Sequence, residues 1–212
     1  MSSSLPQRRV TALGAGSCDT CSTGRVYEQI DERLARWIVA QPVFFVATAP
    51  QSTEGLVNCS PKGNRQELAV LGPSRVGYLD QTGSGAETIG HLRENGRIVL
   101  MFCAFSGPPR IVRLHGKGRV LVPGGGEFSE VSGNFAGADG IGRRAIVLIE
   151  VSRISDSCGY GVPLMTFDGH RSTMDEWAER KRRSGVVAYQ QAKNAETLDG
   201  LPALGGLGTA TP

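Results

Sequence analysis

The sequence predicts a mostly β protein, an antiparallel β-barrel with helices at its edges. Short apolar runs rich in Val, Ile and Phe recur along most of the chain, and such runs are typical of strands. Turns containing Gly or Pro join most of these runs, which argues against a parallel sheet whose strands alternate with helices. The 29 glycines among 212 residues also suit a turn-rich β protein, or a backbone that lies close to a ligand.

The composition limits the classes of function. Hydrophobic residues make up 40% of the chain and charged residues 20%, as in an ordinary globular protein. The net charge of +3 is too small to indicate nucleic-acid binding. The sequence lacks a run of 18 apolar residues, and residues 1–10 lack the apolar centre of a signal peptide. We therefore expect a cytoplasmic protein that binds neither nucleic acid nor membranes.

The cysteines and histidines do not indicate a metal site. Five cysteines at irregular spacing do not form a recognisable disulfide framework. Cys18 and Cys21 could be half of a zinc site or a redox pair, but the sequence has neither a second pair nor a nearby histidine. They lie in residues 1–24, which are rich in Ser, Gly and Thr and are expected to form a flexible N-terminal tail. We expect no metal.

A single domain is expected over residues 25–202, followed by a loose C-terminal segment at 203–212. Its first element is a helix over residues 27–40, where apolar residues recur at helical spacing until Gln41-Pro42. The predicted strands are 43–49, 55–59, 67–71, 75–80, 97–105, 110–122 and 144–151. Further helices are predicted near Phe128 and from Thr173 through Trp177, and residues 60–64, 106–109 and 155–163 are predicted loops.

Residues 78–97, YLDQTGSGAETIGHLRENGR, form a candidate phosphate site between a strand and a short helix. Ser84 is predicted to be the N-cap of this helix, with Glu87 completing a capping box three residues later. Thr82, Gly83 and Ser84 would then bring hydroxyl groups and open backbone N–H groups to the positive end of the helix. The same pattern also describes a plain capped helix with a flexible entry turn.

A second polar stretch, NCSPKG at residues 58–63, places Ser60 and Lys62 at the end of a strand. A lysine there suits a phosphate or a reduced flavin anion, although a solvated turn has the same sequence. Arg113 could point into a site or lie on the barrel surface. Cys158 lacks an interpretable His or Asp partner. Because no acid–base or nucleophilic arrangement accompanies the phosphate candidate, we expect a bound cofactor to carry the reactivity.

The order of these motifs resembles the pyridoxamine 5'-phosphate oxidase-like family, whose members are split β-barrels that usually bind FMN. The motifs are, in order, VFFVATA, VNCSPKG, YLDQTGSGAETIGHLREN, RIVLMFCAF and RIVRLHGKG. Together with the SCGY loop and the segment KNAETLDGLP, they resemble an uncharacterised branch of that family. The resemblance implies an antiparallel split β-barrel with flanking helices, similar to flavin reductases and pyridoxamine-phosphate oxidases. It also implies a homodimer with sites at the interface and FMN, or alternatively a deazaflavin, as the cofactor.

The resemblance also implies which residues contact the cofactor. Two loops would hold the phosphate and ribityl chain, two residues between them would lie along the flavin ring, and one basic residue would come from the crossing strand. These implied residues are Asn58, Cys59, Ser60, Lys62, Thr82, Gly83, Ser84, Thr88 and Arg113. The resemblance does not assign catalytic residues.

Two departures from the family pattern bear on the activity. Pyridoxamine-phosphate oxidases carry an Arg-Lys pair at the start of the small helix, where this chain has Glu87 and Thr88. They also end in an arginine-rich motif, where this chain has DGLPAL. We therefore do not expect pyridoxal phosphate synthesis. The hypotheses are an FMN-dependent oxidoreductase of a small molecule, a non-catalytic protein that binds flavin, deazaflavin or haem, and a dimeric scaffold with a vestigial site.

Overall fold

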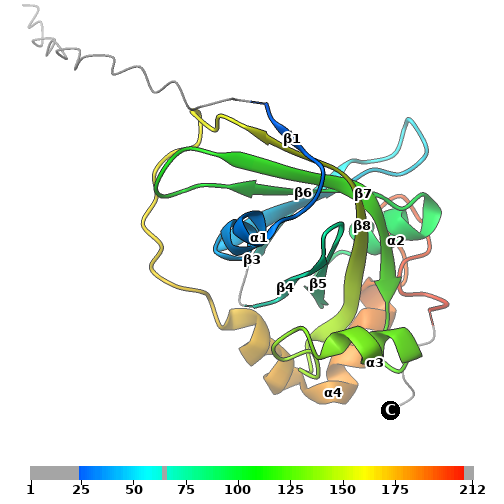
Figure 1. Ribbon diagram of the computed structural model, residues 1–212. Coiled ribbons are helices and arrows are strands. Elements are labelled where there is room, and N and C mark those ends of the chain that lie inside the picture. Colours follow the sequence, from blue (N-terminus) through cyan, green and yellow to red (C-terminus); the bar gives the residue numbers. More distant parts are fainter. Residues whose placement is uncertain (1–23, 64–65, 208–212) are drawn as a thin grey trace, which may run out of the picture.

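A curled antiparallel sheet dominates the computed structural model, which describes residues 24–63 and 66–207 (Figure 1). Its strands are β1 (Val26–Tyr27), β2 (Val43–Thr48), β3 (Asn58–Gly63), β4 (Leu68–Gly72), β5 (Arg75–Gln81), β6 (Arg97–Cys103), β7 (Ile111–Leu121) and β8 (Arg143–Ser157). The helices of the described residues are α1 (Glu32–Val39), α2 (Glu87–Glu94), α3 (Gly126–Ser132) and α4 (Thr173–Lys193). None of these helices is both long enough and apolar enough to cross a membrane.

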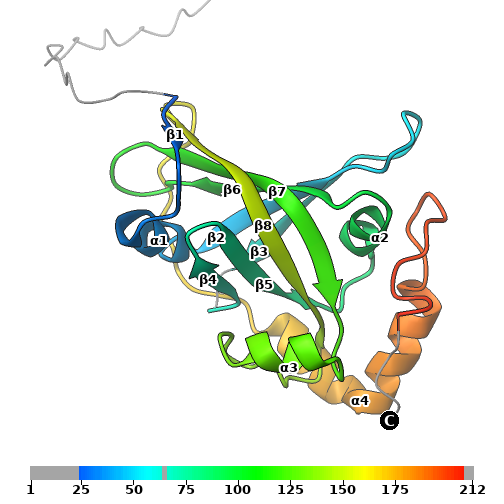
Figure 2. The same cartoon turned by 45° about the vertical axis from the view of Figure 1, so that its right-hand side comes forward.

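The strand order is β3-β2-β6-β7-β8-β5-β4, and every neighbouring pair is antiparallel. The 15-residue strand β8 pairs with β7 along one edge, and with β5 and then β1 along the other. The sheet is strongly curled (Figure 2). Lys62 of β3 therefore reaches Asp80 of β5, although these strands lie near opposite ends of the order. The predicted antiparallel split β-barrel with flanking helices is confirmed.

The barrel interior is filled by residues that alternate along the strands. In β2 every second residue is buried, as the two-residue period of a strand requires. Phe44 lies at the centre, with its ring centroid 5.6 Å from those of both Tyr78 and Phe102. Leu34 and Ile38 of α1 pack against the same cluster and are buried. The helix thus covers one opening of the curled sheet (Figure 1).

Several element boundaries differ from the sequence prediction. Helix α1 begins at Glu32 and not at residue 27, because the Asp31 side chain caps it by accepting a hydrogen bond from the Leu34 backbone N–H at 2.7 Å. Residues 60–63, predicted to be a loop, continue β3, which begins at Asn58. At the other end of the chain, α4 extends to Lys193 and is kinked at Arg182, where φ is 59°.

The segment after α4 packs against α2. Ala203 and Leu204 are buried in a cluster with Ala86 and Ile89, and this segment lies beside α2 in Figure 2. The loose segment expected from residue 203 therefore does not begin there. The predicted N-terminal tail, with Cys18 and Cys21, lies outside the described residues except for Gly24.

Candidate functional site

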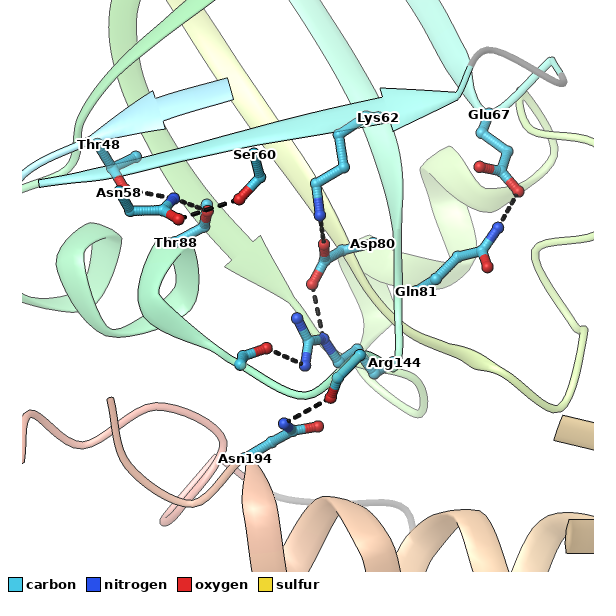
Figure 3. A network of polar contacts seen from close by, with 12 residues as sticks. Thr48, Asn58, Ser60, Lys62, Glu67, Asp80, Gln81, Thr88, Arg144 and Asn194 are labelled. Atoms are coloured by element: carbon cyan, nitrogen blue, oxygen red, sulfur yellow. Dashed lines mark hydrogen bonds and ion pairs between the residues drawn. The ribbon is translucent and has the colours of Figure 1, made fainter. Parts of the chain in front are cut away.

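A row of polar side chains runs along the inner face of β3 (Figure 3). Asn58, Ser60 and Lys62 share this face because alternate residues of a strand point the same way. The Asn58 side-chain amide donates to the hydroxyl of Thr88 on α2 at 3.0 Å and to that of Thr48 on β2 at 3.3 Å. The Ser60 hydroxyl in turn donates to the Asn58 carbonyl oxygen at 3.0 Å. The structure therefore brings three predicted site residues, Asn58, Ser60 and Thr88, into one hydrogen-bonded group.

A buried ion triad continues this row. Asp80 on β5 is fully buried, and its two carboxylate oxygens accept from Lys62 Nζ at 2.8 Å and from Arg144 Nε at 2.7 Å. Burial raises the pKa of this carboxyl, but the Arg144 guanidinium and the Lys62 ammonium outweigh burial and lower the pKa from 3.8 to about 2. Asp80 is thus an anion at neutral pH, and it holds Lys62 at the edge of the site.

The turn at residues 82–85, which is the candidate phosphate site, forms hydrogen bonds with side chains that are distant in the sequence. Gln190 Nε2 donates to the Thr82 hydroxyl at 2.7 Å, and Asn194 Nδ2 donates to the Gly83 carbonyl at 3.0 Å. Arg144 Nη1 donates to the Gly85 carbonyl at 2.9 Å. The described side-chain contacts of Thr82 and of the two glycine carbonyls therefore lie on the side of α4 and β8. Figure 3 shows the contacts made by Arg144 and Asn194.

The start of α2 differs from the prediction. The helix begins at Glu87, its N-cap residue is Ala86, and no side chain caps it. Ser84 is therefore not the N-cap, because the turn continues for two more residues before the helical backbone begins. The Ser84 side chain is exposed, and apart from the residues adjacent to Gly83, no described heavy atom lies within 4 Å of the point where a Cβ on Gly83 would be. An uncapped helix end, an exposed hydroxyl and open space beside a glycine together fit a phosphate group.

The negative charge of Glu87 would repel a phosphate group bound at this turn. A Cβ added at Gly85 would overlap the Glu87 carboxylate, so this carboxylate lies against the turn. Around the turn, the positive charges of Lys62 and Arg144 are matched by the negative charges of Asp80 and Glu87. The site therefore offers hydrogen-bond donors to an anion but no excess of positive charge.

A cavity of about 760 Å³ adjoins the Lys62 end of the polar row. It lies between the strands β3 and β5 and the segment that leads into α4. Its apolar lining includes Val43, Leu79, Phe105, Met165, Phe167 and Met174, and its polar lining includes Lys62, Gln81, His170 and Arg171. Residues 165–174 were not predicted to line a site, although two methionines and a phenylalanine in a polar connecting segment are a usable signal.

Two predicted cofactor residues lie on the opposite, outer face of the sheet. Cys59 alternates with the inward row of β3 and is exposed. Arg113 lies on the outer face of β7, where its guanidinium donates to the Ser157 hydroxyl at 3.0 Å. Within one chain, the structure does not bring these two side chains to the polar row. Among the residues that the structure describes, no three His, Cys, Asp or Glu side chains are grouped so as to hold a metal ion.

Comparison with known proteins assigns the family. The family model described as pyridoxamine 5'-phosphate oxidase matches residues 30–158. The chain is also 38% identical to a pyridoxamine 5'-phosphate oxidase family protein of Aspergillus flavus, ustO, in a match that covers 84% of this chain and 77% of the relative. The chain belongs to the pyridoxamine 5'-phosphate oxidase family. Most of the match coincides with the sheet and α2, so family membership includes both polar stretches of the candidate site.

Solved structures also resemble this chain, with lower sequence identity. HupZ from Group A Streptococcus has a TM-score of 0.44 with 21% identity, over 59% of this chain and 91% of that chain. An FMN-binding protein from Syntrophomonas wolfei has a TM-score of 0.42 with 14% identity, over 62% of this chain and 86% of that chain.

Proposed function

We propose that this protein is a flavin-dependent oxidoreductase that acts on a small molecule, with FMN as its cofactor. The observation that carries the proposal is the uncapped start of α2, which lies beside an open, exposed turn and within the same polar region as Lys62. Family membership supports a flavin, because a split barrel of this family usually binds FMN. When bound, the flavin supplies the hydride chemistry that the described side chains lack.

The chain's own residues have distinct tasks in this proposal. The Ser84 hydroxyl and the first backbone N–H groups of α2 bind the phosphate. Lys62 uses one N–H to bind Asp80 and has others for the cofactor, since an ammonium group has three donors. Asp80 and Arg144 position Lys62 and the turn. Pyridoxal phosphate synthesis is not part of the proposal, because Glu87 lies where the family's phosphate-binding pair begins.

A homodimer is part of the proposal. The outer face of β2, β6 and β7 carries partly exposed side chains that include Phe45, Met101 and Arg113. A second copy that covers this face would bury Phe45 and Met101. It would also bring Cys59 and Arg113 close to a cofactor at the interface. Light scattering of the purified protein tests this proposal, and a monomer at micromolar concentration would contradict it.

The test of the cofactor is flavin binding by the full chain. FMN is titrated into the protein while flavin fluorescence is followed, with Ser84→Ala as the variant and Ser106→Ala, in an exposed turn far along the chain, as the matched control. We expect saturable binding that Ser84→Ala weakens about fivefold and the control leaves unchanged. Absence of FMN binding by the wild-type protein would refute the proposal.

A flavin-binding protein without turnover is the second candidate. It is favoured by the polar row, in which Ser60 and Thr88 both hydrogen-bond to Asn58, so that these three side chains are occupied with one group and do not present an acid or a base to a substrate. The same fold could hold flavin, a deazaflavin or haem in that role. Stopped-flow reduction of the bound flavin by NADH or NADPH separates the two candidates, because a pure binder would not be reduced at a catalytic rate.

A further inference from the structure

The cavity beside Lys62 has a chemical character that the flavin proposal does not use. One wall consists of Phe105, Met165, Phe167 and Met174, which present aromatic rings and thioether groups. Phe167 is itself held edge-on to the His170 ring, with a centroid separation of 4.9 Å. Thioethers and ring edges make favourable contacts with flat aromatic molecules. At about 760 Å³, the cavity is within the usual range for a small-molecule site.

The charges in the cavity are not all paired. Lys62 is bound to Asp80 at 2.8 Å, and Glu67 is bound to Arg143 at 2.9 Å. Arg171 also lines the cavity, and no acidic side chain among the described residues forms an ion pair with it. The neighbouring acid Asp168 is not part of the lining. The remaining charge at the cavity is therefore the Arg171 guanidinium, which suits a carboxylate because it can donate two parallel hydrogen bonds.

We propose that this cavity binds a small aromatic molecule that carries one carboxylate. The apolar wall holds the ring, and Arg171 binds the carboxylate. Binding itself does not depend on a cofactor. The additional step, that this molecule is the substrate of the oxidoreductase, rests on the proposed function, which places a flavin at Lys62 and Gly83, on the rim that these residues contribute to the cavity.

The experiment compares two probes of nearly the same shape by isothermal titration calorimetry on the full chain. The probes are 2-naphthoate, which is an anion, and 2-naphthalenemethanol, which is neutral. We expect the wild-type protein to bind the anion about tenfold more tightly, because a charged hydrogen bond adds to the same apolar contact. Arg171→Gln should remove that advantage and leave the neutral probe unchanged, whereas Phe167→Ala should weaken both probes.

Two variants control for folding and for non-specific charge. Arg171→Lys keeps the positive charge and should restore part of the preference for the anion. Arg180→Gln removes an exposed arginine of α4 and should change neither probe. Equal affinity of the two probes for the wild-type protein, or an equal effect of Arg171→Gln and Arg180→Gln, would overturn the proposal.

Repeating the titration with FMN present separates this proposal from the flavin proposal. Naphthoate binding that persists beside FMN supports an adjoining site, and competition between the two would overturn it by making the cavity the place of the flavin itself. Naphthoate binding without any FMN binding would refute only the proposed function. A stable dimer that binds neither naphthalene probe would show that a second copy covers the cavity, and it would overturn the aromatic-acid site.

Discussion

Removing the charge of Asp80 gives the sharpest test of how the site is held together. Asp80→Asn keeps the size of the side chain but leaves Lys62 and Arg144 without their shared anion. The Asp80 and Arg144 side chains are 0% and 5% exposed, so water cannot replace the lost partner. Breaking a buried ion pair by removing one partner typically costs about 3 to 5 kcal/mol of folding free energy.

The lowered pKa of Asp80 indicates a contribution of similar size. A pKa that falls from 3.8 to about 2 on folding corresponds to roughly 2 to 3 kcal/mol. Because the folded pKa is the lower one, this stability is fully present above pH 4 and is lost as the pH falls through 2. We therefore expect Asp80→Asn to lose about 3 kcal/mol at pH 7, and the difference from the wild type to shrink between about pH 4 and pH 2.

Urea denaturation at a series of pH values measures this difference. Asp139→Asn is the matched control, since Asp139 is exposed, and its effect should stay within about 0.5 kcal/mol. A variant Asp80→Asn as stable as the control at pH 7 would refute the assigned role of the triad. So would a destabilisation that remains constant down to pH 2.

Three further predictions concern the turn and α2. Asn194→Ala removes the side chain that holds the turn, and it should weaken FMN binding about fivefold in a fluorescence titration. An unchanged affinity would count against a positioning role. Glu87→Gln should tighten FMN binding a few-fold at low salt and leave riboflavin, which lacks the phosphate, unaffected; equal effects on both ligands would contradict the charge argument. Gly90→Ala should destabilise the protein by about 1 to 3 kcal/mol, because its Cβ would overlap Thr197, whereas Gly126→Ala enters open space and should be tolerated in a thermal melt.

The strands of the core were predictable because their burial follows a two-residue period that the sequence displays directly. Strand β7 shows this, with Val112 and Leu114 buried and Arg113 on the opposite face, as the alternation predicted. Strand β3 was predicted only in part, since Pro61 and Gly63 are typical of loops. Its extension follows from pairing with β2, where Phe45 and Val43 lie opposite these two residues. Such pairing is a property of the tertiary fold and not of the local sequence.

The parts of the candidate site that lie in one short stretch of sequence were predictable. The parts contributed by residues far away in the chain were not. The turn at residues 82–85 and the lysine of β3 were identified from short motifs. Arg144, Gln190 and Asn194 were missed, because they reach the turn across 59 to 111 residues of chain. A doubled arginine directly before the apolar run of β8 was a signal for the first of these, but α4 gave no comparable indication.

The predicted N-cap at Ser84 was wrong because distant side chains, and not a local capping box, hold the turn. A capping box would have fixed the start of α2 locally, with Ser84 bound to a backbone N–H of the helix. The structure instead fixes the turn through Arg144, Gln190 and Asn194, which occupy acceptors on its far side. No side chain caps the first N–H groups of α2. A locally capped helix would use those donors for its own stability, whereas a turn held by distant side chains keeps them available for an anion. The same arrangement couples the turn to the packing of α4, so in the proposed function the side chains of Gln190 and Asn194 would support an anion at the turn.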